Sequence, residues 1–136
     1  MPIKITLTEY LELLERHPNL TAHGLKSEKL CRIEKIDYQG YRNALKEQYD
    51  AFLKCCDWLS QCPLTKKISP KSPLSYDIRE KLEAPLGCYI SNGAFIAAVF
   101  YLGIPYAPTY SGTNIQVAIS RRRDLLSNNQ KNRPPG

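Results

Sequence analysis

The sequence has no apolar run long enough to cross a membrane. The longest run, residues 94–102, has nine residues, whereas a spanning helix needs about 20. Residues 1–4, Met-Pro-Ile-Lys, also lack the apolar stretch of a secretory signal. We therefore expect a cytoplasmic protein. Its 43% apolar and 24% charged residues are typical of a packed globular chain.

The five cysteines contain no C-x-x-C pair and do not have the spacing of zinc ligands. In a cytoplasmic protein such thiols are usually reduced and buried. A nucleophilic Cys88 would need His17 or His23 as its base, and nothing in the sequence brings these residues together. We expect no disulfide framework, no metal and no cofactor.

Sequence motifs of common enzymes are also absent. The chain has no G-x-S-x-G, H-E-x-x-H, Walker-type or G-x-G-x-x-G motif. Its carboxylates are scattered rather than paired in an apolar setting, so general acid–base chemistry has no obvious site. The sequence therefore predicts a protein that is not an enzyme.

Positive charge is concentrated at the C-terminal end. The net charge is +6 overall, and residues 121–136 carry +4 of it, because they contain five basic residues and a single acidic one, Asp124. Residues 1–120 carry only +2. We predict a single globular domain over residues 1–123 and a flexible basic tail over residues 124–136, which has few apolar side chains to anchor it.

Apolar residues recur at helical spacing in several segments. Residues 6–9 form a capping box that opens a first helix ending near His17-Pro18. Residues 30–38 fit a helix slightly better than a strand, and both remain open. The clearest amphipathic pattern runs from Tyr41 to Leu59 and predicts one long helix. A further helix is expected from Pro73 to Ala84.

The segment from Ala94 to Leu102 contains only apolar and tyrosine side chains. Ser91 can cap its start, and Gly103 stands where a left-handed terminator is expected. A helix that is apolar on every side is buried on every side. We therefore predict a core helix here.

Residues 104–120 predict a β-hairpin. Closing the loop Ser111–Asn114 would pair Tyr110 with Ile115, Pro108 with Val117 and Tyr106 with Ile119, so that all six share one face. The predicted fold class is α+β, with four or so helices and a C-terminal β-hairpin.

The order of helix, break, helix, hairpin and basic run resembles a winged helix-turn-helix. That resemblance implies DNA binding, with the second helix in the major groove and the hairpin on the backbone. The lack of polar side chains on residues 94–102 counts against base reading by that helix. The candidate nucleic-acid contacts are Lys66, Lys67, Lys71, Ser91, Asn92, Gly93, Arg121, Arg122 and Arg123.

Ser91-Asn92-Gly93 has two interpretations. Free N–H groups at a helix start, beside a glycine, could bind an anion or a backbone carbonyl. The alternative is an ordinary N-cap followed by a closely packed glycine.

Nine tyrosines suggest a second function class. Tyr106 and Tyr110 lie on the predicted hairpin, and tyrosine is common at protein interfaces. The alternative to DNA association is therefore a protein-binding adaptor or inhibitor that uses this hairpin. The same tyrosines could instead close the core of a small domain.

The segment Ser75-Tyr76 through Tyr89-Ile90-Ser91-Asn92-Gly93-Ala94-Phe95-Ile96-Ala97-Ala98 is similar to uncharacterised small bacterial proteins of the mobile-element type. The likeness covers about a third of the chain. It implies a bacterial source and no particular activity.

Overall fold

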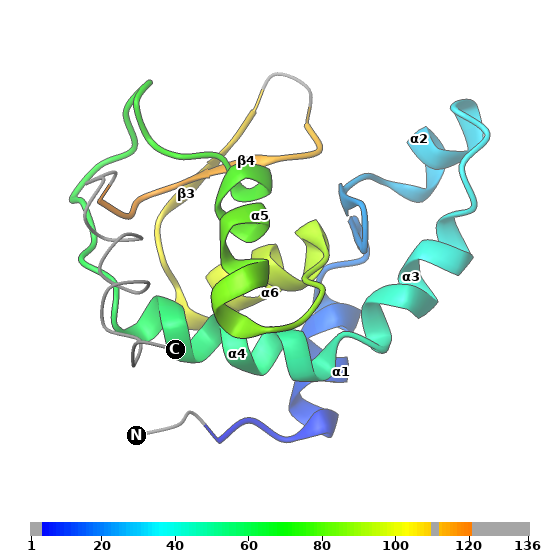
Figure 1. The fold of residues 1–136 in the computed structure, drawn as a ribbon. Coiled ribbons are helices and arrows are strands. Elements are labelled where there is room, and N and C mark those ends of the chain that lie inside the picture. Colours follow the sequence, from blue (N-terminus) through cyan, green and yellow to red (C-terminus); the bar gives the residue numbers. More distant parts are fainter. Residues whose placement is uncertain (1–3, 110–111, 121–136) are drawn as a thin grey trace.

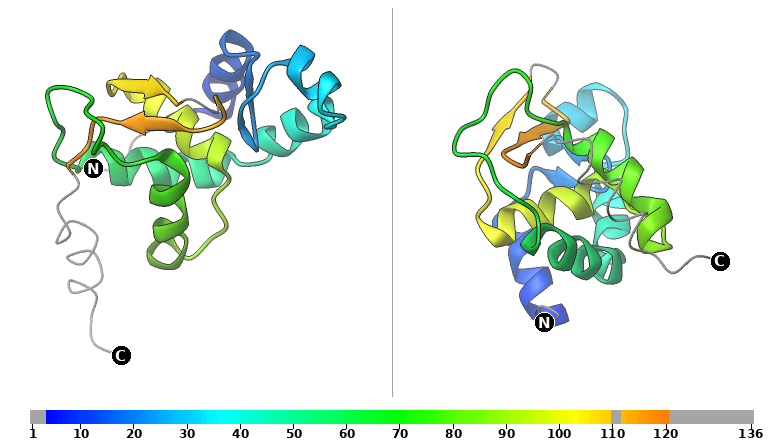
Figure 2. Two further views of the ribbon diagram at one scale, coloured as in Figure 1. Left: turned by 90° about the horizontal axis from the view of Figure 1, so that it is seen from above. Right: turned by 60° about the vertical axis from the view of Figure 1, so that its left-hand side comes forward.

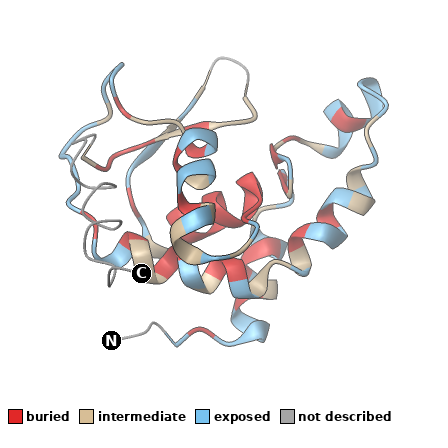
Figure 3. Cartoon of the chain, viewed as in Figure 1, coloured by how far each residue is buried: buried red, intermediate tan, exposed pale blue. Residues whose placement is uncertain are grey.

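Helix α6, Asn92–Leu102, lies at the centre of the fold (Figure 1). The computed structural model describes residues 4–109 and 112–120. The hydroxyl of Ser91 accepts a hydrogen bond from the Ala94 N–H, and Gly103 ends the helix at φ 68°. Residues 92–99 are buried, which confirms the predicted core helix (Figure 3). Its most extensive packing is against α4, Tyr49–Ser60.

The N-terminal part begins as predicted. Helix α1, Leu7–Arg16, opens on the capping box between Thr6 and Glu9. A small antiparallel hairpin follows, in which Leu20 pairs with Leu25 and Thr21 with Gly24. The elements that follow α1 are β1 (Leu20–Thr21), β2 (Gly24–Leu25), α2 (Glu28–Ile33) and α3 (Tyr38–Lys46).

The prediction of a single helix from Tyr41 to Leu59 is wrong. This segment forms parts of two helices, α3 and α4, which are separated by residues 47–48. In a continuous helix the Leu45 carbonyl would accept the Tyr49 N–H. Instead it accepts from the Tyr10 hydroxyl of α1 and from the Gln48 N–H. The Gln48 side chain in turn accepts the Ser91 N–H before α6. Contacts from distant segments therefore end α3 and start α4.

Helix α5, Ser75–Leu86, starts two residues later than predicted. The Ser72 hydroxyl accepts the Ser69 N–H inside the preceding loop, and Leu74 forms a β-bridge with Gln116. Both contacts hold residues 72–74 outside the helix. These residues therefore connect α5 to the C-terminal hairpin.

The C-terminal hairpin is present with a different register. Strand β3, Tyr106–Pro108, pairs with β4, Ile115–Val117, so that Tyr106 faces Val117 and Pro108 faces Ile115. The predicted pairs were each two residues further on, and the predicted partner of Tyr106, Ile119, bridges Leu64 instead. A shift of two residues keeps the same side chains on each face. Tyr110 lies outside the described residues.

The described residues form a mixed α+β fold with six helices and two small antiparallel sheets. Figure 2 shows α6 enclosed by α4, α5 and the hairpins rather than standing at the surface. A winged helix-turn-helix exposes its second helix to DNA, whereas residues 92–99 of α6 are buried, and the winged-helix resemblance is therefore not confirmed. No helix in the described part of the chain is long and apolar enough to span a membrane.

Candidate functional site

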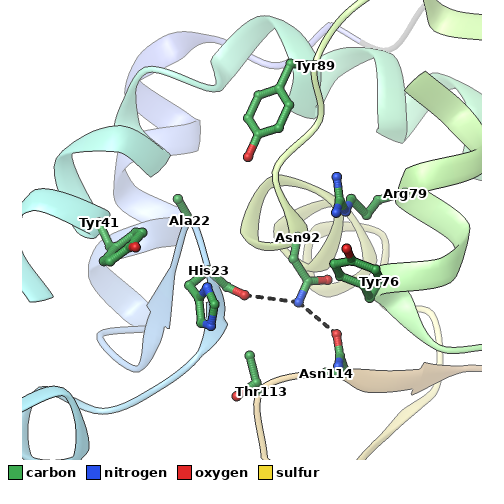
Figure 4. A pocket seen from close by; sticks show the side chains of 9 residues that line it. All are labelled: Ala22, His23, Tyr41, Tyr76, Arg79, Tyr89, Asn92, Thr113 and Asn114. Carbon is green, nitrogen blue, oxygen red and sulfur yellow. Dashed lines mark hydrogen bonds between the residues drawn. The ribbon is translucent and has the colours of Figure 1, made fainter. Parts of the chain in front are cut away.

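An open pocket of about 570 Å³ lies where six segments of the chain meet. Figure 4 shows side chains from the β1–β2 turn, α3, α5, the α5–α6 loop, the start of α6 and the turn before β4 around a common space. We call this space the Asn92 pocket. Its lining residues are Ala22, His23, Tyr41, Tyr76, Arg79, Tyr89, Asn92, Thr113 and Asn114.

Asn92, the first residue of α6, has the central position. Its side-chain Nδ2 donates to the His23 carbonyl at 3.2 Å and to Asn114 Oδ1 at 2.9 Å. A backbone carbonyl can only accept, so the His23 contact fixes which end of the amide faces it. The residue is only 6% exposed, and its Oδ1 has no hydrogen-bond partner among the described residues. Figure 4 shows this oxygen turned toward Tyr76 and Arg79.

The backbone at the start of α6 is closed to ligands. The Gly93 N–H donates to the Ala22 carbonyl at 3.1 Å, and the Ala94 N–H donates to the Ser91 hydroxyl. A Cβ on Gly93 would lie 1.9 Å from the Thr21 carbonyl oxygen. Ser91 and Gly93, predicted as contacts for an anion, are therefore buried and already bonded. Only the Asn92 side chain reaches the pocket.

Arg79 of α5 supplies the second unpartnered atom. Its Nη1 donates to Glu83 Oε1 and to the Ile90 carbonyl, both at 3.3 Å. The guanidinium also stacks on the Tyr76 ring, 4.3 Å from the ring centroid. Its Nε is buried and has no partner among the described residues. Arg79 is thus held in place by Glu83 and Tyr76, while its buried Nε–H has no partner among the described residues.

Three exposed tyrosines surround the mouth of the pocket. The exposed fractions of Tyr41, Tyr76 and Tyr89 are 40%, 45% and 66%. The His23 ring lies 5.7 Å from that of Tyr41, which widens the aromatic wall on that side. Large exposed aromatic side chains gathered at one concave place are typical of a binding site.

The predicted lysines lie elsewhere. Lys66, Lys67 and Lys71 are all exposed on residues 63–73, which we call the lysine loop. This loop runs along β4 and the residues after it: Gln116 Nε2 donates to the Ser69 carbonyl, and the Thr65 N–H donates to the Ala118 carbonyl. The pocket includes Thr113 and Asn114 before β4, and none of the three lysines lines it. Arg121, Arg122 and Arg123 lie outside the described residues.

The hairpin tyrosine that the structure describes is at the surface. Tyr106 is exposed, and its ring centroid lies 4.8 Å from that of Phe100 at the end of α6. It does not line the Asn92 pocket. The structure therefore separates Tyr106 from the tyrosines around the pocket.

Three of the buried cysteines are poorly suited to nucleophilic chemistry. Burial raises the pKa of Cys56 and Cys62 to about 12, and it also raises the pKa of Cys55. These thiols are therefore protonated at neutral pH. Within residues 4–109 and 112–120, no group of histidine, cysteine and acidic side chains is arranged to hold a metal ion.

Sequence reasoning found Asn92 but not its companions. His23, Tyr41 and Tyr89 come from segments far apart in the sequence, and no local pattern connects them to α6. The spacing of Tyr76 and Arg79, three residues apart on one helix, was the one local signal, since it places both side chains on the same face. No known protein family, curated protein or solved structure matches this chain.

Proposed function

We propose that this protein is a non-catalytic binding protein whose Asn92 pocket holds a planar, uncharged group. The observation that carries the proposal is the Asn92 Oδ1 atom, which is buried at the pocket without a partner. Leaving a buried acceptor unpaired costs about 1–3 kcal/mol. Folded proteins retain few such atoms, and a binding role is one reason to keep one.

The two unpartnered atoms define the chemistry of the bound group. Asn92 Oδ1 needs a donor, and Arg79 Nε needs an acceptor. An ionised carboxylate or phosphate diester has no hydrogen to donate to Oδ1. The charge of Arg79 is also already matched by Glu83. These features favour an uncharged group that both donates and accepts over a simple anion.

Entry into the pocket requires side-chain movement. Neither Oδ1 nor Nε is in contact with solvent, whereas the neighbouring Tyr76 side chain is half-exposed and stacks on the guanidinium. We expect this ring to shift when a ligand binds and to cover the ligand afterwards. Rotation of a surface side chain is a small change compared with a loop movement.

Benzamide and benzoate form a matched pair of probes. Both are planar rings of similar size, but only benzamide both donates and accepts. In saturation-transfer NMR at pH 7 we expect a signal with benzamide and little with benzoate. Tyr89→Ala should remove the benzamide signal, while the control Tyr106→Ala, an exposed tyrosine away from the pocket, should keep it.

The proposal would be overturned by an absent benzamide signal, by a stronger benzoate signal, or by a benzamide signal unchanged in Tyr89→Ala. Circular dichroism of each variant checks that it is folded. Tyr89 is 66% exposed, so its truncation should leave the core intact.

DNA association is the second candidate, and the lysine loop favours it. Three exposed lysines lie on one loop that contains no acid. Such a loop attracts phosphates whatever the base sequence. This form of the proposal relies on the phosphate backbone and gives α6 no part in reading bases.

Fluorescence anisotropy with a mixed-sequence duplex at several salt concentrations tests this candidate. Changing Lys66, Lys67 and Lys71 to Gln should weaken binding and lower the log–log salt slope by about 3. The matched control changes Lys29, Lys35 and Lys81 to Gln, which removes the same charge from other exposed positions. Equal losses in both triple variants would count against a specific role for the loop.

A further inference from the structure

We infer that the Asn92 pocket receives an unpaired nucleobase of a single-stranded nucleic acid. This inference rests on the proposed function, because it assigns a chemical class to the uncharged planar group. It also gives the pocket and the lysine loop a common ligand.

The polar edge of a base fits the two unpartnered atoms. Every base has a ring nitrogen or carbonyl acceptor beside an amino or imino donor on its pairing edge. The acceptor would take the Arg79 Nε–H, and the donor would give its hydrogen to Asn92 Oδ1. Asn92 Nδ2 is already shared between His23 and Asn114, so Asn92 acts here only as an acceptor.

The aromatic walls suit the faces of a base. Tyr76 and Tyr89 lie on the α5 side of the pocket, and Tyr41 with His23 lies across from them (Figure 4). Stacking on tyrosine stabilises a bound base whatever its sequence. The mouth of the pocket, lined by Tyr41, Tyr76 and Tyr89, is open to solvent. The sugar and phosphates can therefore remain outside while the base enters.

The ligand must be unpaired. In a duplex the pairing edge is engaged and both faces are stacked, so a base reaches a pocket only after it is flipped out at an energetic cost. Proteins that read single strands instead combine exposed aromatic side chains with basic groups along the backbone. Here Tyr41, Tyr76 and Tyr89 at the pocket mouth supply the first, and the exposed lysines of the lysine loop supply the second.

The test compares a fluorescein-labelled 12-nucleotide single strand with the same sequence held in a duplex, using the full chain at one salt concentration. We expect the single strand to bind at least tenfold more tightly. Tyr89→Ala should weaken single-strand binding by about fivefold to a hundredfold. Tyr106→Ala should leave it unchanged.

A strand of thymidines methylated at N3 tests the polar edge separately. The methyl group removes the imino hydrogen that Asn92 Oδ1 would accept and keeps the ring face for stacking. We expect binding at least fivefold weaker than to the unmethylated strand. Equal binding of the two strands would overturn the polar-edge assignment.

The outcomes separate this inference from the proposed function. If benzamide binds but single and double strands bind equally, the nucleobase assignment fails and the binding pocket stands. If Tyr89→Ala binds single strands as tightly as the natural chain does, the base lies outside the pocket and the inference also fails. A tyrosine-dependent preference for the single strand, lost on N3 methylation, supports it.

Discussion

At the scale of single residues, Arg42 holds the N-terminal half together. It belongs to α3, yet its guanidinium donates to three carbonyls of another part of the chain: Nη2 to Leu14, and Nη1 to His17 and Leu20. The last carbonyls of a helix lack the regular partners of those in its middle. The Leu14 and His17 carbonyls also accept the backbone N–H groups of His17 and Leu20, and Arg42 adds a charged donor at the end of α1 and at β1. Its charge is also favourable at a helix C-terminus.

Arg42→Met should destabilise the protein by about 3 kcal/mol or more, because it removes three hydrogen bonds from a charged donor. Arg42→Lys should recover only part of this loss, since a compact ammonium cannot reach all three oxygens as the planar guanidinium does. Urea denaturation measures both variants. Equal stability of the Lys variant and the natural chain would mean that charge alone, and not the fork of donors, is needed at this position.

At the scale of elements, the segments with local signals were predicted well. Helix α1 has its capping box, and α6 has Ser91 before it and Gly103 after it. The break between α3 and α4 depends on Tyr10 and Ser91, which are far away in the sequence. The hairpin register likewise depends on Leu64 bridging Ile119. Local patterns cannot show such contacts, because tertiary partners decide them.

The contact between β1 and the start of α6 gives a prediction about packing. Gly93→Ala would place a Cβ 1.9 Å from the Thr21 carbonyl oxygen, so the β1–β2 hairpin would have to move away. Overpacking of this kind costs about 1–3 kcal/mol or more. It would also break the bond from Gly93 N–H to Ala22 and disturb the wall of the Asn92 pocket. We expect lower stability by urea denaturation and weaker benzamide binding.

Gly103→Ala is the comparison for that variant. Gly103 also borders α6, but the space around it is open and only its positive φ opposes a side chain. The left-handed conformation costs an L-residue roughly 1–2 kcal/mol. This variant should lose stability and retain benzamide binding, because it lies at the other end of the helix from the pocket. Equal loss of binding in both variants would point to a general effect of unfolding.

At the scale of the whole molecule, the pocket exists only when the two halves of the chain are docked. His23 and Tyr41 come from the N-terminal half, and Arg79, Asn92 and Asn114 come from the C-terminal half. The Nδ2 of Asn92 bonds to both halves through His23 and Asn114. A ligand that binds only the docked arrangement must stabilise the whole fold by mass action.

His17 couples the same two halves and makes their docking sensitive to pH. It follows α1, and its ring centroid lies 4.6 Å from that of Phe100 on α6. Burial lowers the pKa of His17, and the neighbouring Arg16 lowers it further. The unfolded chain, where the histidine pKa is about 6.5, therefore binds a proton more readily than the folded chain. Stability must fall as pH drops through about 6.5 toward the lowered pKa and then level off.

His17→Phe should remove this part of the pH dependence, because phenylalanine keeps a ring against Phe100 and does not titrate. Urea denaturation at pH 7.5 and 5.5 compares the change in unfolding free energy with that of the natural chain. Arg16→Gln is the control: it removes only the smaller cause, so most of the pH-dependent loss should remain. If His17→Phe loses as much stability on acidification as the natural chain, another group carries the effect and His17 does not link docking to pH.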